Sequence, residues 1–287
     1  MNKIKIVTDS SSDIPADLAE KFDIELIPLY VGYGHEMYKD NIQVDHDAIF
    51  KALLDGKKVN TAAPSPGDFY KVFEKILKDD KATCIICITL SSRLSGSYNS
   101  AITARKMLPY SDIRIIDSKT STLSLGLIPI QAAMAVKKGH SLEETLELIE
   151  TLIGLNRFLA VLGSFEYVFK GGRAAFFGNI FSKAFLLTPV LTIGRSGKVN
   201  LKKFSLNQDK ALNYIADNAL SIAKEYKRVN VGLFYGKDSE PIKEVKRLFE
   251  SSKDISIDLL IENKITTVIS AHTGPEIWGI AVSPVIV

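Results

Sequence analysis

Cysteine and histidine are scarce in this chain of 287 residues, which contains two of the first and four of the second. The two cysteines, Cys84 and Cys87, form a C-x-x-C pattern, but no second Cys or His pair completes a set of zinc ligands. Both lie in the apolar run 83–89, which is typical of a buried strand, where residues three apart point to opposite faces. We therefore interpret both as small core residues and expect no metal site.

The sequence also lacks the signatures of nucleotide and nucleic-acid binding. Neither G-x-x-x-x-G-K-[ST] nor a G-x-G-x-x-G that opens a helix occurs, which excludes a P-loop and a dinucleotide fingerprint. The 36 basic and 33 acidic residues leave a formal charge of +3, which is too balanced to indicate a basic binding surface. We expect no nucleic-acid partner.

Long uninterrupted hydrophobic runs are missing as well. The most apolar stretch, 174–194, contains polar residues and a proline, so it falls short of the roughly 20 apolar residues that cross a bilayer. We expect a helix over about 179–187 whose broad apolar face packs in the core, lines the site of an apolar ligand or makes transient membrane contact.

The first residues, 1–9, lack the apolar core of a signal peptide, so we expect a cytoplasmic protein.

What the sequence does contain is a regular alternation of predicted strands and helices. In the first half we expect strands over 3–8, 25–31, 82–89 and 113–117, and helices over 15–22, 45–55, 65–77, 99–107 and 124–138. Near-continuous runs of Ile, Val and Cys in these strands indicate a parallel sheet that is buried on both faces. The expected fold class is α/β, with an N-terminal parallel-sheet domain of three layers.

The second half follows a different pattern. After a helix over 142–153 we expect a helix near 164–169, a hairpin of 190–193 and 199–204, helices over 210–226 and 240–252, and strands over 229–235, 255–260 and 278–282. This order is typical of an α+β domain. We therefore divide the chain into an N-terminal α/β domain, 1–155, and a C-terminal α+β domain, 156–287.

A hydroxyl-rich loop, residues 90–98, connects an expected strand to an expected helix. Free backbone N–H groups and the positive end of the helix dipole gather at such a helix start, which favours an anion. The hydroxyls around one glycine suit a small group such as a carboxylate, and Ser92, Ser95 and Gly96 are the candidate binding residues. The alternative is that these serines only cap the helix.

Two further segments carry groups that could join this site. Thr61 opens the extended loop 61–66, whose hydroxyls either bind the same anion or cap the following helix. His272 lies in an expected turn between apolar segments, flanked by Thr, Gly and Pro, and is a candidate donor to an anion. We assign no role to the other histidines, which lie in polar segments expected to be exposed: His35, His46 and His140.

Taken in order, several of these motifs resemble those of the DegV family. The matching segments, which span nearly the whole chain, are residues 8–15, 61–66, 90–101, 117–118 with 124–126, 170–173 and 272–275. Each motif is weakly specific alone, whereas the ordered set is strongly specific.

The resemblance implies a bacterial protein that binds one long-chain fatty acid, such as palmitate, between its two domains. It implies that Thr61 and Ser95 bind the acyl carboxylate and that His272 belongs to the same network. It also implies a carrier subunit with no cofactor and no catalytic residues, which presents the fatty acid to a separate kinase that makes an acyl phosphate for phospholipid synthesis.

The chain departs from the family pattern at four positions. Ala62 stands where the family often has a serine, and Ala174 stands where an aliphatic residue such as Ile is common. Glu276 and Trp278 stand where Gly and Val are common. We expect these changes to leave carboxylate binding intact and to alter the shape of the acyl tunnel.

Two other functions use the same residues. A hydrolase or phosphotransferase could use Ser95 as nucleophile and His272 as base, although no G-x-S-x-G elbow is present. A regulatory module that senses lipid would share the binding site and differ only in its partner. Arg173 either pairs with a carboxylate or faces a phosphate-bearing partner such as the kinase.

Overall fold

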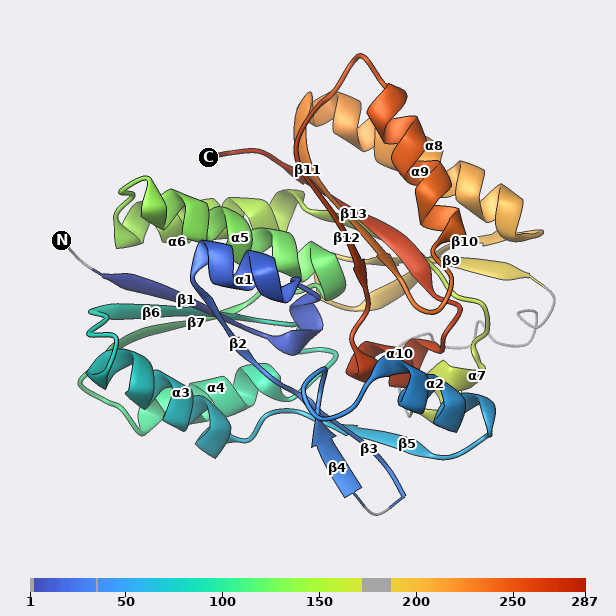
Figure 1. Cartoon of the computed structure of the whole chain (residues 1–287). Helices are drawn as coiled ribbons and strands as arrows, with labels where there is room; N and C mark the ends of the chain where they lie inside the picture. Colours follow the sequence, from blue (N-terminus) through green and yellow to red (C-terminus); the bar gives the residue numbers. More distant parts are fainter. Residues whose placement is uncertain (1–2, 35, 172–186) are drawn as a thin grey trace.

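A four-stranded parallel sheet forms the centre of the N-terminal half. The computed structural model describes residues 3–34, 36–171 and 187–287. The strands of this first sheet, in spatial order, are β2 (Ile24–Ile27), β1 (Ile4–Asp9), β6 (Cys84–Thr89) and β7 (Asp112–Asp117). Every residue of β1 and β6 is buried, as expected for central strands covered on both faces. The predicted parallel sheet is confirmed (Figure 1).

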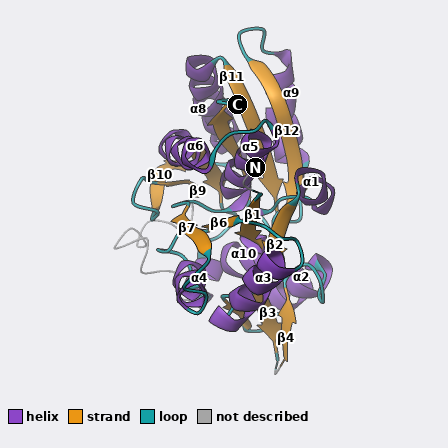
Figure 2. Ribbon diagram, turned by 90° about the vertical axis from the view of Figure 1, so that its left-hand side faces the viewer, coloured by secondary structure: helices purple, strands orange, loops and turns teal. Residues whose placement is uncertain are grey.

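Helices cover both faces of the first sheet. One face packs against α3 (Pro66–Lys78) and α4 (Ser97–Lys106), and the other against α1 (Ala16–Phe22) and α5 (Thr122–Lys137) (Figure 2). On this second side α6 (Leu142–Leu155) packs against α5. Cys84 packs in the core on the α5 side and Cys87 in the core on the α3 side, so the two thiols do face opposite ways. Burial raises the pKa of Cys84 to about 12 and also raises the pKa of Cys87, which keeps both thiols protonated.

A six-stranded mixed sheet forms the C-terminal half. In spatial order its strands are β10 (Val199–Ser205), β9 (Thr188–Ile193), β8 (Arg157–Val161), β13 (Trp278–Pro284), β11 (Arg228–Tyr235) and β12 (Ser256–Lys264). Its outer face is covered by α8 (Gln208–Tyr226) and α9 (Glu240–Ser251). The α+β prediction is confirmed, but β8 was not predicted from the sequence.

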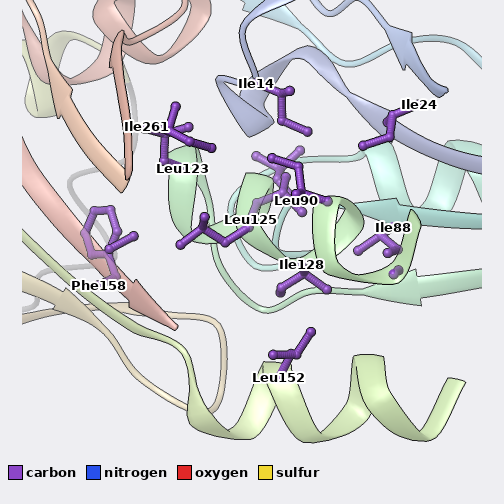
Figure 3. Close-up of a cluster of buried hydrophobic side chains, with 14 of the residues drawn as sticks. Ile14, Ile24, Ile88, Leu90, Leu123, Leu125, Ile128, Leu152, Phe158 and Ile261 are labelled. Atoms are coloured by element: carbon purple, nitrogen blue, oxygen red, sulfur yellow. The ribbon is translucent and has the colours of Figure 1, made fainter. Parts of the chain in front are cut away.

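Helix α5 lies between the two large sheets and packs against both. It contacts β1 and β2 on one side and β11 and β13 on the other, and nearly all of its residues are buried. A helix that is apolar all round belongs in a core. Figure 3 shows Leu125 and Ile128 of this helix in one cluster with Ile88 of the first sheet and Phe158 of the second. The division of the chain near residue 155, at the end of α6, stays a prediction.

A small antiparallel sheet lies beside the two large ones. It consists of β4 (Glu36–Lys39), β3 (Tyr30–Tyr33) and β5 (Val59–Ala62), and three helices pack near it: α2 (His46–Leu54), α7 (Glu166–Lys170) and α10 (Thr267–Thr273). The single strand predicted over 25–31 is wrong. The pairing ends before Pro28, which lacks an N–H donor, and the chain then continues into the small sheet as β3.

Two histidines differ from their predicted settings. His46 is half-buried rather than exposed: its Nε2 lies 2.5 Å from the carbonyl oxygen of Ile265, and burial lowers its pKa. His272 lies in the last turn of α10 and not in an irregular turn. The helix ends at Gly274, whose φ of 80° only glycine adopts readily.

Two predictions fall on residues 172–186, outside the described part of the chain. These are the helix over 179–187, most of which lies there, and the partner-binding role of Arg173. Among the helices of residues 3–34, 36–171 and 187–287, none combines the length and the apolar character that crossing a bilayer requires.

Candidate functional site

A largely apolar cavity lies where the first sheet, the small sheet and the six-stranded sheet meet. It encloses about 130 Å³, far more than the roughly 10–15 Å³ that one water molecule needs. Aliphatic and aromatic side chains of β8, β9, β10 and α10 form most of its wall, for example Phe158, Leu191 and Val268. The polar residues that line it are Thr61, Ser95, Ser121, Thr122, His272 and Thr273. No Asp, Glu, Lys or Arg side chain belongs to the described lining.

The side chains of Thr61 and His272 contact each other in the cavity wall. Thr61 lies on β5, opposite Val31 of β3, and His272 lies at the end of α10. The Thr61 Oγ1 and His272 Nε2 atoms are 2.7 Å apart, a hydrogen bond between residues separated by 211 positions. The direction of this bond depends on the tautomer of the imidazole. Two of the residues singled out from the sequence are therefore brought together.

Ser95 lies in the loop between β6 and α4, and this loop is tightly held. The Asp9 carboxylate accepts a hydrogen bond from the backbone N–H of Leu90 (2.9 Å), and Ser91 Oγ donates to the carbonyl oxygen of Gly197 (2.8 Å). Ser95 Oγ accepts from the backbone N–H of Ser97 at 3.2 Å and lies 3.0 Å from the Ser97 hydroxyl. The loop is thus fixed from the first sheet and from the hairpin of the second, with Ser95 facing the cavity.

The other two residues proposed from the same loop lie differently. Ser92 is directed toward Asp117, which accepts hydrogen bonds from its hydroxyl (2.5 Å) and from its backbone N–H (3.1 Å). Gly96 is the residue before α4, where an added Cβ would lie 3.7 Å from the Cβ of Ala63. Neither belongs to the cavity lining among the described residues. Their role in ligand binding stays a prediction.

Two buried carboxylates hold the start of α10, the helix that carries His272. Asp13 accepts a hydrogen bond from the backbone N–H of Thr266 (2.8 Å). Asp40 accepts from the hydroxyl of Thr267 (2.6 Å) and from the backbone N–H of Val268 (3.3 Å). Burial raises the pKa of both carboxyl groups. Two carboxyl groups far away in the sequence therefore cap this short helix, and sequence reasoning found neither of them.

The arrangement suits binding of an anion with an apolar tail better than nucleophilic catalysis. A serine nucleophile needs a base within hydrogen-bond reach. Here Ser95 Oγ contacts the hydroxyl of Ser97, and His272 Nε2 contacts Thr61. Nε2 of the imidazole is thus engaged by a threonine, and the hydroxyl of Ser95 by a neighbouring serine.

Sequence reasoning missed three cavity hydroxyls: Ser121, Thr122 and Thr273. Ser121 and Thr122 lie at the start of α5, and Thr273 follows His272 on α10. Ser121 and Thr122 could have been predicted from the turn that follows β7. It lies at the carboxyl end of a parallel strand, as the loop with Ser95 does.

The fold and the cavity define a class of α/β proteins with two large sheets, one small sheet and an apolar cavity between the halves of the chain. The family model described as "Uncharacterised protein, DegV family" matches residues 3–285. The chain belongs to the DegV family, as the ordered motifs suggested.

Relatives and solved structures agree with this assignment over the full length of the chain. A DegV domain-containing protein from Caldanaerobacter subterraneus is 32% identical over 280 residues, which is 98% of each chain. A DegV family protein from Thermus thermophilus, whose structure is described in terms of fatty acid binding, has a TM-score of 0.90 at 27% identity and covers 98% of this chain and 99% of its own. A stearic acid-binding protein from Eubacterium ventriosum has a TM-score of 0.88 at 28% identity, with 99% of each chain covered.

Proposed function

We propose that this protein binds one long-chain fatty acid in its cavity, with the carboxylate at Thr61, Ser95 and His272 and the acyl chain along the aliphatic wall. The observation that carries the proposal is the cavity itself, which is apolar except for a few hydroxyls and one imidazole. The described fatty acid binding of structurally similar DegV proteins supports it.

The chemistry of the polar group fits a carboxylate. If the imidazole carries its proton on Nε2, that N–H donates to Thr61 Oγ1, and the threonine hydroxyl is left to donate to the ligand. Ser95 supplies a second hydroxyl from the opposite loop. Hydrogen bonds to a charged acceptor are stronger than neutral ones, so neutral donors can hold the anion without a buried ion pair.

The acyl chain supplies most of the binding free energy. Each methylene removed from water contributes about 0.8 kcal/mol, so a chain of palmitate length outweighs the few hydrogen bonds of its head group. We therefore expect the chain to set affinity and the polar group to set orientation.

Native mass spectrometry of the purified protein, followed by solvent extraction, tests the proposal. We expect one fatty acid per chain or, for protein stripped of lipid, uptake of one equivalent of added palmitate or stearate. Protein that is empty and takes up neither acid would refute the proposal. A lipid-sensing module would give the same result, because it uses the same site.

For the fate of the bound acid, we propose that a separate kinase phosphorylates it to an acyl phosphate for phospholipid synthesis. The support is the family resemblance of the ordered motifs. In this scheme the protein is a cytoplasmic carrier, which makes transient membrane contact, and Arg173 contacts the phosphate-bearing partner. Acyl-phosphate formation with the kinase should fall in an Arg173→Ala protein, and a normal rate would remove that role.

A further inference from the structure

The cavity wall carries a second pair of hydroxyl groups at the start of α5. Ser121 is 4% exposed and Thr122 is 2% exposed, and both line the cavity. Neither hydroxyl oxygen has a hydrogen-bond partner among the residues that the structure describes. Ser121 occupies the N-cap position of α5, yet its side chain does not cap the helix.

This lack of partners is unusual because buried hydroxyls are nearly always hydrogen-bonded. Thr122 also has a φ of 53°, a left-handed conformation that a β-branched residue rarely adopts. Strained backbone of this kind concentrates at ligand sites. Unpaired donors and a strained backbone therefore coincide at one place on the cavity wall.

The surroundings define what these hydroxyls can bind. Leu94, Phe158 and Ile193 line the same cavity, and no Asp, Glu, Lys or Arg belongs to the described lining. Because the proposed ligand has a single carboxylate, which is assigned to Thr61, Ser95 and His272, the group left for this pair is a neutral one on the acyl chain. Because the start of α5 also presents the positive end of a helix dipole, the group should accept hydrogen bonds. A hydroxyl or keto oxygen has these properties, whereas a methylene has none of them.

We propose that Ser121 and Thr122 form a second polar site along the cavity, which binds an oxygen substituent on the fatty-acid chain. The inference rests on the proposed function, since it needs the acyl chain to lie in the cavity. The ligand class is then a hydroxy or keto fatty acid, held at its carboxylate by one group of residues and at its chain oxygen by another.

A comparison of stearate with a series of hydroxystearates, whose hydroxyl moves along the chain, tests the proposal. In an ordinary apolar cavity a chain hydroxyl weakens binding, because it loses water and gains no partner. In the wild-type protein we expect at least one hydroxystearate to bind as tightly as stearate or more tightly. Titration calorimetry on lipid-free protein measures both affinities.

The Ser121→Ala/Thr122→Val double variant should reverse this preference. It should bind the favoured hydroxystearate about tenfold more weakly than wild type, while its affinity for stearate stays close to that of wild type, because the two hydroxyls are already buried and a methylene chain offers them no hydrogen bond. Thr120→Val is the matched control. Its hydroxyl is also buried without a described partner, one residue before the pair, but it does not line the cavity, so both affinities should stay as in wild type.

The other outcomes separate the two proposals. If stearate does not bind the wild-type protein, the proposed function fails, and this inference fails with it. If stearate binds and every hydroxystearate binds at least about tenfold more weakly, the second polar site is refuted without any variant. If the double variant loses stearate as well, the pair binds the carboxylate instead, and the inference is overturned.

Discussion

At the scale of single residues, the contact between Thr61 and His272 links distant parts of the chain at the cavity. Thr61 lies in the small sheet, and His272 lies near the C-terminal end of the sequence. Sequence reasoning could single out Thr61, Ser95 and His272, which line the cavity, because each falls in a hydroxyl-rich loop or beside a Gly-Pro turn. It could not separate Ser95 from Ser92, because spacing alone does not tell which way a loop hydroxyl points.

Removing the hydroxyls of Thr61 and Ser95, which we propose bind the carboxylate, should weaken ligand binding. In a Thr61→Val/Ser95→Ala protein we expect affinity for palmitate to fall at least about tenfold, since each hydrogen bond to a charged group contributes about 1.5–3 kcal/mol. Native mass spectrometry of occupancy checks this. Thr61→Ser keeps the hydroxyl and should retain most of the affinity. Full occupancy of the double variant would show that the carboxylate binds elsewhere.

Gly171 leaves room for the ring of His272. A Cβ at this position would lie 2.4 Å from the His272 Nδ1 atom and 3.1 Å from the carbonyl oxygen of Tyr167. We therefore expect Gly171→Ala to displace the imidazole and to lower palmitate affinity several-fold, as measured by titration calorimetry.

Gly154 provides the control for this substitution. It lies inside α6 with no atom within 4 Å of an added Cβ. Gly154→Ala should leave palmitate affinity unchanged and raise the free energy of unfolding by up to about 1 kcal/mol through helix propensity. Equal affinities for the two variants would mean that the position of the imidazole has no influence on binding.

At the scale of secondary-structure elements, α10 shows why sequence prediction reached its limit. Its residues 267–271 are Thr, Val, Ile, Ser and Ala, a composition rich in β-branched side chains that does not favour a helix. Asp13 and Asp40, which lie more than 220 positions earlier, supply its caps. The long central strands and amphipathic helices were predictable because their patterns are local, whereas α10 depends on tertiary contacts.

Breaking this cap should affect both stability and ligand binding. In Asp40→Ala the donors of Thr267 and Val268 lose their acceptor, and we expect the free energy of unfolding to fall by about 2 kcal/mol or more. Palmitate affinity should fall as well, because α10 carries His272. Urea denaturation and titration calorimetry measure the two effects.

A second helix cap offers a matched comparison. Asp45 accepts a hydrogen bond from the backbone N–H of Ala48 (2.8 Å) at the start of α2. Asp45→Ala should lower stability by about 1 kcal/mol without changing palmitate affinity. Asp40→Ala with unaltered affinity would show that the cap does not position the imidazole.

At the scale of the whole molecule, three buried carboxyl groups lie where the first sheet, the small sheet and α10 meet: Asp9, Asp13 and Asp40. Burial raises the pKa of Asp9 to about 6, although hydrogen bonds from Ser11 and Leu90 oppose the rise. Burial raises the pKa of the other two as well. The folded protein therefore holds protons at a pH at which the unfolded chain has released them.

This difference predicts an unusual dependence of stability on pH. Because the three carboxyl groups bind more protons in the folded state, they should increase the free energy of unfolding as the pH falls from about 7 to about 5, with Asp9 contributing about 1 kcal/mol. His46, whose pKa is lowered by burial, acts in the opposite direction. The increase should level off near the unfolded pKa, which is 3.8 for this side chain. Urea denaturation at several pH values measures it, and Asp9→Asn should flatten the profile. Stability that falls steadily over this range would contradict the prediction.

The position of β13 has a consequence for how the protein is made. This strand, Trp278–Pro284, lies in the middle of the six-stranded sheet between β8 and β11, and it also contacts α5. While the ribosome is still adding residues before it, β8 and β11 have no partner between them, and one side of α5 remains uncovered. A ribosome-stalled chain that stops before Trp278 should therefore be cleaved rapidly by protease within its second half. β13 is therefore the last strand to join the core. In the interval between the synthesis of α5 and that of β13, one side of α5 is exposed, and we expect the nascent chain to depend most on a chaperone during this interval.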